Sequence, residues 1–503
     1  MATDYISFKD DGTAVLNDPA TPVAAAIIRG EVITSDLVEF GGRNGDLRFL
    51  APDPHTLIRR LPLGNPQKLA DVHALSVDEI LDYLRALGAE MDLSRNVHLQ
   101  YALELSLETA PTTPPLVRNQ YGRLPALFTQ DALEDMVAGI GRDYLDGWVE
   151  TRVAASGAKR HVRAFGARAL HIVAGNSPVL SAVTVIRNAV ARSDAIIKAP
   201  SNDPFTGIAV ARTMIDMAPD HPITKHVSVA YWRGGDELFE SKLYQPHNIE
   251  KIVAWGGFAS VKHVTKYIQP GLELVSLDPK RSISIVGADA FDSEENLDDV
   301  AVRIAADMGA HNQEVCASAR VVYVQTGTDE AGIEKLADLG QRVYDKLLTL
   351  PERISTAPKM GINPELRRDL DAAAMLDDFY HVIGGKQGEG AVIVSKMPEP
   401  VDFAPTLINR VANLVAVDSI DEVYPRVDSY TQTVGIYPEK LVDEIQDPLS
   451  IAGAQRIVSL GYAGASTTGF GAPQDGIEPV RRLVKWIHRE ESDPAVTPGI
   501  WNH

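Results

Sequence analysis

The sequence predicts an α/β fold built on a parallel sheet with helices on both faces. The observation behind this prediction is a strand, a turn and a helix that follow one another four times. The four expected strands are Ala169–Ala174, Asp194–Lys198, Val227–Tyr231 and Ile249–Trp255. This order is typical of a parallel sheet whose connecting helices cover both of its faces. In such sheets, ligands bind beyond the carboxyl ends of the strands.

The segments on either side of this repeat have different patterns. Residues 1–75 contain short apolar or alternating segments split by Gly and Pro, such as Val23–Ile33, and predict a strand-rich N-terminal extension. A helical pattern starts at Ser76, which with Glu79 forms a capping box. A polar run leads to Cys316, and the β-branched run Val321–Val324 after it predicts a buried strand.

The chain of 503 residues is long enough for about three domains of ~150 residues each. We expect residues 1–75 to form the extension and residues 76–285 to form a dinucleotide-binding domain. Residues 286–455 are expected to form a catalytic α/β domain that carries the cysteine. The C-terminal segment, residues 456–503, is expected to return to the cofactor domain or to an oligomer interface.

Composition excludes several classes of function. The formal net charge of −20 would repel phosphate backbones, so we expect no nucleic-acid partner. No window approaches the ~18 uninterrupted apolar residues of a membrane helix. There is no CxxC, HExxH or clustered His/Cys, so no metal site is expected. A single cysteine excludes an intramolecular disulfide, and the acidic start MATDYISFKDDG has no apolar core, so we expect a cytoplasmic location.

Two features point to chemistry, and each has an ordinary alternative. Cys316 is the only cysteine and comes just before an expected buried strand, where a thiol can be presented at a cleft. A lone cysteine can also be a small buried hydrophobic residue. Gly234 and Gly235 open a helix after the third strand, where backbone N–H groups can hold a pyrophosphate. No GxGxxG is present, and a glycine pair can simply serve a tight turn.

Four stretches, in order, resemble the aldehyde dehydrogenase superfamily and, within it, the acyl-CoA reductase (LuxC-type) family that makes fatty aldehydes in bacterial luminescence. They are HIVAGNSP, IIKAPSNDP, KIVAWGG and HNQEVCASAR, and the terminal GFGAPQDGIEPVRRLVKWI is also similar to that branch. The resemblance covers roughly Tyr144 to His488. It implies an aldehyde-dehydrogenase-like fold with a parallel-sheet cofactor domain and an α/β catalytic domain.

The resemblance implies two catalytic residues. Cys316 matches the family nucleophile, which takes an acyl group from a thioester. Asn176 matches the side-chain amide that holds the oxyanion together with the backbone N–H of the cysteine. A tetrahedral intermediate needs two such donors near ~3 Å. Seen alone, Asn176 would fit an Asx-turn that caps the following helix.

The resemblance also implies a set of cofactor-binding residues. Lys198 matches the lysine that binds the adenosine ribose hydroxyls, and Ser201 stands where NAD-preferring members carry a glutamate. Because a serine would not repel a 2′-phosphate, we expect NADPH, with Arg233 as a further candidate cation. The turn packed against the cofactor matches Trp255, Gly256 and Gly257.

One departure from the family pattern concerns the base that hydrolyses the acyl-enzyme in oxidising members. The position of that glutamate is Ser276 here, and a serine cannot serve as such a base at neutral pH. An acyl-cysteine without a hydrolytic base favours reduction over oxidation to an acid. Glu273 or Glu314 would supply a carboxylate if the alignment is shifted.

These observations predict an NADPH-dependent acyl-CoA reductase that makes an aldehyde through an acyl-cysteine. One alternative is an NAD(P)-dependent aldehyde dehydrogenase that oxidises aldehydes, and another is a non-catalytic scaffold in a fatty acid reductase complex. The resemblance implies an acyl-CoA or acyl-protein donor, an acyl-protein synthetase as a partner, and a homo-oligomer.

Overall fold

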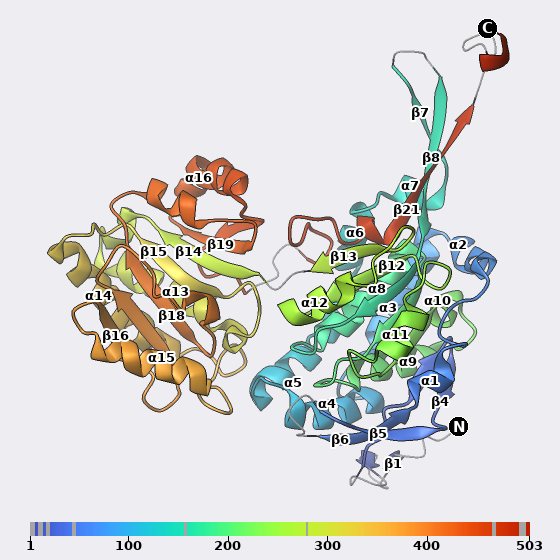
Figure 1. The fold of residues 1–503 in the computed structure, drawn as a ribbon, viewed down its shortest axis with the longest axis horizontal. Helices are drawn as coiled ribbons and strands as arrows, with labels where there is room; N and C mark the ends of the chain where they lie inside the picture. Colours follow the sequence, from blue (N-terminus) through green and yellow to red (C-terminus); the bar gives the residue numbers. More distant parts are fainter. Residues whose placement is uncertain are drawn as a thin grey trace.

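The computed structural model describes residues 6–8, 14–16, 21–42, 47–154, 158–277, 280–464, 469–491 and 499–502. These residues form two lobes, each built on a seven-stranded sheet (Figure 1). The first sheet ends at Leu277 and the second begins at Arg281, whereas the sequence predicts that the cofactor domain extends to residue 285. The described residues do not include Asp278, Pro279 or the N-terminal MATDY.

The first sheet has the strand order β13-β12-β9-β10-β11-β3-β4. The five strands β9 to β13 run parallel to one another. At one edge of the sheet, β3 runs antiparallel to β11, and β4 runs antiparallel to β3. Part of residues 1–75 therefore joins this sheet. The bounds are β3 Ala26–Ile28, β4 Glu31–Ile33, β9 Arg168–Ile172, β10 Asp194–Lys198, β11 Val227–Ala230, β12 Lys251–Trp255 and β13 Glu273–Leu277.

Alternate residues of each strand in this sheet enter two different cores. Ala195 and Ile197 of β10 pack into one core, and Ile196 between them packs into the other. This alternation is the period of two that a strand covered on both faces requires. Helices of the first core are α3 Val77–Glu90, α4 Val97–Thr109, α5 Pro114–Gly122, α6 Gln130–Ala138, α8 Val179–Ala191 and α9 Thr206–Met217. Helices of the second are α1 Pro54–Leu57, α11 Glu237–Leu243 and α12 Phe258–Thr265.

The second sheet has the order β16-β17-β18-β15-β14-β19-β20 and is parallel except for β16. Its strands are β14 Arg281–Val286, β15 Ala319–Val324, β16 Tyr380–Gly384, β17 Ala391–Ser395, β18 Val411–Ala416, β19 Thr431–Tyr437 and β20 Arg456–Ser459. One face packs on α13 Glu294–Gly309 and α14 Glu330–Leu348. The other packs on α15 Pro364–Met375 and α16 Glu439–Ala452. The strand predicted over Val321–Val324 is therefore the buried end of β15.

Two smaller sheets complete the molecule. An antiparallel sheet of β7 Val149–Arg152, β8 Lys159–Gly166 and β21 Val484–Glu491 extends away from both lobes (Figure 1). A hairpin of β5 Leu37–Gly41 and β6 Arg48–Pro52 packs on the first lobe, where Phe40 meets Tyr231 edge to face at 4.9 Å. Of the helices in the described part of the chain, none has the length and apolar character needed to cross a bilayer.

Candidate active site

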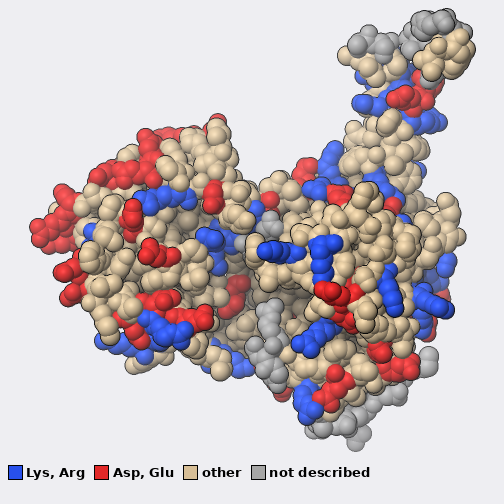
Figure 2. All heavy atoms as spheres, in the orientation of Figure 1, with Lys and Arg blue, Asp and Glu red and all other residues tan. Residues whose placement is uncertain are grey.

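A cavity of about 1230 Å³ lies between the two lobes and is lined by residues from both. Figure 2 shows the hollow between the lobes. The last residues of four parallel strands of the first sheet line it, as expected for ligand sites at carboxyl ends. These are Ile172, Lys198, Trp255 and Leu277. The second lobe contributes the segment around Cys316, so the expected nucleophile and most of the expected cofactor residues share one cavity.

The loop that carries Cys316 is held by buried polar side chains. His311, Asn312 and Gln313 have φ values of 53°, 55° and 64°, in the left-handed region that residues other than glycine rarely adopt. The buried Gln313 side chain fixes this turn, since its amide nitrogen donates to Val411 O at 2.8 Å and its oxygen accepts from Val411 N at 2.9 Å. The polar run before the cysteine therefore shapes the loop that presents the thiol.

Cys316 lines the cavity and has specific polar neighbours. The Gln432 side-chain nitrogen donates a hydrogen bond to the Cys316 sulfur at 2.9 Å, and Ser282 Oγ donates to the Cys316 carbonyl at 2.7 Å. Burial raises the pKa of the thiol, and the negative charge of Asp475 raises it further. The Gln432 hydrogen bond and the positive charge of Arg320 oppose this increase in pKa. The sulfur is thus desolvated, with one donor aimed at it.

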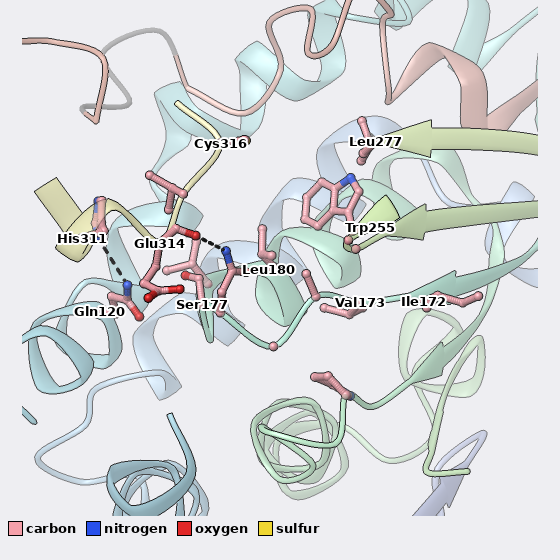
Figure 3. A pocket seen from close by; sticks show the side chains of 18 of the residues that line it. Gln120, Ile172, Val173, Ser177, Leu180, Trp255, Leu277, His311, Glu314 and Cys316 are labelled. Atoms are coloured by element: carbon pink, nitrogen blue, oxygen red, sulfur yellow. Dashed lines mark hydrogen bonds between the residues drawn. The ribbon is translucent and has the colours of Figure 1, made fainter. Parts of the chain in front are cut away.

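Asn176 lies in the turn after β9 and contacts the cysteine loop. Its side-chain nitrogen donates to the Glu314 carbonyl at 3.0 Å, two residues before Cys316 (Figure 3 shows Glu314 and Cys316). A Cβ on Gly175 would lie 1.9 Å from Asn202 Oδ1, so glycine is required at the position before Asn176. Two of the sequence stretches, HIVAGNSP and IIKAPSNDP, thus meet at this turn.

Lys198 is desolvated at the end of β10. Its ammonium lies 5.8 Å from the Tyr231 ring centroid and 5.6 Å from that of Trp232. Burial lowers the pKa of Lys198 to about 8, and the nearby charge of Glu240 only partly offsets that effect. A lysine in this state gains from a ligand oxygen that accepts its N–H groups.

The other expected cofactor residues lie around Lys198 with one difference. Ser201, Gly234, Trp255, Gly256 and Gly257 all line the cavity, and Arg233 lies beside them. Gly235 is not among the lining residues. It has a φ of 91°, and its N–H donates to Glu240 at 3.2 Å, so its glycine serves the turn itself.

Of the two carboxylates considered in the sequence, Glu273 and Glu314, only Glu314 lines the cavity. Glu273 begins β13, at the opposite end of the strand from Leu277, and its carboxylate pairs with Lys251 at 2.5 Å and with Arg482. Ser276 pairs with Ala254 within the sheet. Glu314 does line the cavity, and so does Asp475. Asp475 accepts a hydrogen bond from Gln432 at 2.8 Å.

Gln432 and Asp475 are the contacts that sequence reasoning missed. The stretch GFGAPQDG resembles the family, but no local pattern assigns a role to Asp475 within it. Gln432 is the second residue of β19 and lies between Thr431 and Thr433 at the polar start of that strand. The cavity is also lined by Glu39, Phe40, Gly41 and Gly42 from the N-terminal hairpin, where the sequence shows no catalytic pattern. Among the described residues, no group of three or more His, Cys, Asp and Glu could hold a metal ion.

The apolar part of the cavity lies on helices of the first lobe. Leu127 and Met136 contribute from the segment η2 Leu124–Phe128 and from α6, and Leu180 contributes from α8. Phe470 adds an aromatic side chain from the C-terminal segment. A cavity with an apolar wall and a few convergent polar groups is typical of a small-molecule binding site.

Comparison with solved structures identifies the fold. An NADP-dependent glyceraldehyde-3-phosphate dehydrogenase from Bacillus halodurans, solved with NADP, superposes with a TM-score of 0.69 at 13% identity, covering 93% of this chain and 98% of that chain. An aldehyde dehydrogenase from Brucella melitensis superposes with a TM-score of 0.70 at 12% identity, covering 95% and 99%. The aldehyde-dehydrogenase-like α/β fold expected from the sequence is therefore confirmed.

Comparison of sequences identifies the family. A long-chain acyl-protein thioester reductase from Photorhabdus laumondii is 29% identical over 339 residues, 66% of this chain and 65% of that protein. This match spans less than two thirds of the Photorhabdus protein. A protein of the same name from Vibrio harveyi is 24% identical over 434 residues, which are 85% of each chain. The family model of the acyl-CoA reductases (LuxC) matches residues 72–486. This chain belongs to the acyl-CoA reductase (LuxC) family, as its motifs predict.

Proposed function

We propose that this chain reduces an acyl thioester to an aldehyde with NADPH, through an acyl group held on Cys316. The observation that carries the proposal is the single cavity that joins Cys316 to the strand ends of the first sheet. The relatives named long-chain acyl-protein thioester reductases support the same reaction. So does Ser276, which stands in place of the base that oxidising relatives of this fold use.

In the first step, the Cys316 sulfur attacks the carbonyl carbon of the thioester. A carbon–sulfur bond to Cys316 forms, the bond to the donor sulfur breaks, and the donor leaves as a thiol with the proton that Cys316 gave up. The hydrogen bond from Gln432 favours the ionised sulfur, and Arg320 adds a positive charge nearby. The product of this step is a thioester on Cys316.

Asn176 and the Cys316 backbone N–H are proposed to hold the oxyanion of each tetrahedral intermediate. An amide nitrogen has two N–H groups, and the Glu314 carbonyl takes one from Asn176. The second remains available to a substrate oxygen. Donors that are fixed before the reaction stabilise charge without reorganising, and losing one lowers the rate by about 10²–10³.

The residues around Lys198 fit a nicotinamide dinucleotide. A Cβ added to Gly234 or Gly257 would meet no atom within 4 Å, so the backbone there is open to a ligand. Lys198 offers a desolvated ammonium to ribose hydroxyls, and Trp255, Gly256 and Gly257 form the adjoining wall. When bound, the reduced nicotinamide supplies the hydride that aldehyde formation requires.

The preference for NADPH is proposed from Ser201. A carboxylate at this position would repel a 2′-phosphate, whereas a serine hydroxyl can donate to it. Arg233, which is exposed at the cavity, offers a positive charge close to the same turn. The acyl chain is proposed to follow the apolar wall formed by Leu127, Met136 and Leu180.

One experiment tests the reaction. The protein is mixed with an acyl-CoA and NADPH, and loss of NADPH absorbance, release of free CoA and formation of aldehyde are followed together. Equal amounts of CoA and aldehyde are expected, and mass spectrometry without NADPH should find the acyl group on Cys316. Repeating the assay with an acyl-protein as donor distinguishes the two donor classes.

A second candidate function is the oxidation of aldehydes to acids, and Asp475 is the observation that favours it. This carboxylate lines the cavity near the sulfur, where a base for water would lie. Turnover of aldehyde to acid with NADP⁺, in the absence of any acceptor thiol and faster than the reductive reaction, would establish this second function and refute the first.

We also propose a division of labour within the chain. Residues 76–277 bind the cofactor, and the second lobe from β14 to β20 carries the nucleophile. The C-terminal segment returns to the first lobe, which the pairing of β21 with β8 supports. A homo-oligomer, an acyl-protein synthetase partner and a cytoplasmic location belong to the same proposal. Size-exclusion chromatography with light scattering tests the assembly directly.

A further inference from the structure

Gln432 connects the reacting sulfur to a carboxylate from a distant part of the chain. Its side-chain nitrogen donates to the Cys316 sulfur at 2.9 Å and to Asp475 Oδ1 at 2.8 Å. The Gln432 residue is 6% exposed, so water does not compete for these contacts. One buried amide thus has both of its N–H groups directed at named acceptors.

The orientation of this amide is fixed from both of its ends. An ionised carboxylate only accepts hydrogen bonds, so the nitrogen end of Gln432 must face Asp475. The oxygen end accepts from the Thr433 hydroxyl at 3.3 Å. If the amide were turned over, two acceptors would face each other at Asp475, and the sulfur would lose its donor.

Asp475 is itself held in place by the first lobe. Arg187 of α8 donates to the Phe470 carbonyl at 2.9 Å and to Gln474 Oε1 at 3.3 Å. A backbone turn with hydrogen bonds in both directions between Gln474 and Ile477 encloses Asp475, whose φ is 54°. The carboxylate therefore comes from a segment anchored on one lobe, whereas Gln432 and Cys316 belong to the other.

We propose that Asp475 is a positioning residue that acts through Gln432, so that the amide of Gln432 aims and stabilises the sulfur of Cys316 as nucleophile and as leaving group. This inference rests on the proposed reduction of a thioester. In this arrangement, the Asp475 carboxylate accepts the hydrogen bond from the Gln432 amide and does not direct water at the acyl group on Cys316. The carboxylate in the cavity is then compatible with a reductase.

The charges around the sulfur give the two residues opposite effects. Asp475 raises the pKa of the Cys316 thiol by repulsion, and the Gln432 hydrogen bond lowers it. Arg320 also lowers the pKa of the thiol, and Arg456 contributes a second positive charge that faces it. Loss of the amide, and loss of the negative charge of Asp475 with its role as acceptor kept, should therefore shift the pKa of the thiol in opposite directions, which general damage to the site would not do.

The test is the pH dependence of Cys316 alkylation by iodoacetamide in the full chain, measured by mass spectrometry. Because Cys316 is the only cysteine, each added mass reports on it alone. Gln432→Ala should raise the apparent pKa by about one pH unit and slow alkylation at pH 7 by about tenfold. Asp475→Asn should lower the apparent pKa, since the neutral amide can still accept from Gln432.

Matched controls are Gln446→Ala and Asp443→Asn, exposed residues of α16 that should leave the profile unchanged. If Gln432→Ala does not fold, Gln432→Glu keeps the size of the side chain and should raise the apparent pKa further. Shifts of the same sign in both variants, or an unchanged profile in Asp475→Asn, would overturn the inference.

A second measurement separates positioning from catalysis of hydrolysis. Hydrolysis of the isolated acyl-enzyme should not slow in Asp475→Asn if the carboxylate only orients the amide. A large decrease in hydrolysis with an unchanged alkylation profile would assign Asp475 as a base for water. Alkylation needs no acyl donor and no cofactor, so a wild-type chain that fails to reduce thioesters would refute the proposed function and leave this test intact.

Discussion

The two large sheets of this molecule have the same construction and face the cavity with opposite ends. The first sheet presents carboxyl ends, through Ile172, Lys198, Trp255 and Leu277. The second presents amino ends, since Cys316 precedes β15 and Gln432 is the second residue of β19. The rule that ligands bind beyond the carboxyl ends of parallel strands holds for only one of the two lobes.

The difference separates binding from chemistry. The carboxyl ends of β11 and β12 lead to Gly234 and Gly257, where the backbone is open, which suits a long, flat cofactor. The second sheet contributes the nucleophile from a strained loop, together with the buried amide of Gln432, which suits a single reacting atom. Substitutions in the two lobes should therefore affect different quantities, in the following order of size.

Removing the sulfur should produce the largest effect and test whether the lobes act separately. Cys316→Ala should lower aldehyde formation by at least about a thousandfold, because no covalent intermediate can form. Binding of NADPH, measured by calorimetry, should stay within about threefold of wild type. A loss of cofactor affinity comparable with the loss of activity would break the separation between the lobes.

Asn176→Ala tests the contact between the lobes at the cysteine loop. We expect kcat to fall by about 10²–10³ because one oxyanion donor is lost. The thermal midpoint should change little, since the Glu314 carbonyl lies beside a large cavity. Asn248→Ala is the control, because this asparagine donates to the Lys242 carbonyl and is not among the residues that line the cavity. A fall in kcat of less than threefold would remove Asn176 from the reaction.

Lys198→Met should weaken cofactor binding by about 10–100-fold with a smaller change in kcat, since a hydrogen bond to a charged group is lost. Lys242→Met, on the exposed part of α11, is the control. In the wild type, the pKa of Lys198 is about 8. The ammonium is present below that pH and absent above it, so the affinity for NADPH should fall as pH rises through 8 and become independent of pH in the variant.

Ser201→Glu should give the smallest effect and changes only the choice of cofactor. The new carboxylate would repel a 2′-phosphate and accept a hydrogen bond from a 2′-hydroxyl, so preference should move toward NADH by about tenfold. Ser201→Ala separates the loss of the hydroxyl from the gain of charge. If the ratio of KM for NADPH to KM for NADH is the same in all three proteins, Ser201 does not determine the preference.

The fold and the order of its parts could be predicted because they depend on local patterns. Four strand–turn–helix units give a parallel sheet, and the β-branched run after Cys316 gives the buried strand β15. The strand Ala169–Ala174 is observed as Arg168–Ile172, because Val173 and Ala174, although apolar, already belong to the loop that leads to Asn176. The N-terminal strands that join the first sheet could not be foreseen, because short antiparallel pairings depend on distant partners.

The expected site residues lie in stretches that resemble a known family, whereas Gln432, which donates to the sulfur, lies outside all of those stretches. Cys316 and Asn176 occur in motifs that resemble a family, and the structure brings them into one cavity. Gln432 lies 116 positions beyond the cysteine and reaches it through the pairing of strands within the second sheet, and Asp475 lies 159 positions beyond it and approaches through the packing of the two lobes. No local pattern shows such an encounter, and the rule of carboxyl ends points away from Gln432.

The single cysteine has a consequence for oxidative damage. A peroxide that converts the Cys316 thiolate to a sulfenic acid would stop the reaction in one event per chain. Within these 503 residues no second thiol exists to condense with that acid as a resolving partner. Recovery would require a thiol from outside the chain. Until such a thiol reacts, the sulfenic acid can be oxidised further to the sulfinic and sulfonic acids, which thiols do not reduce.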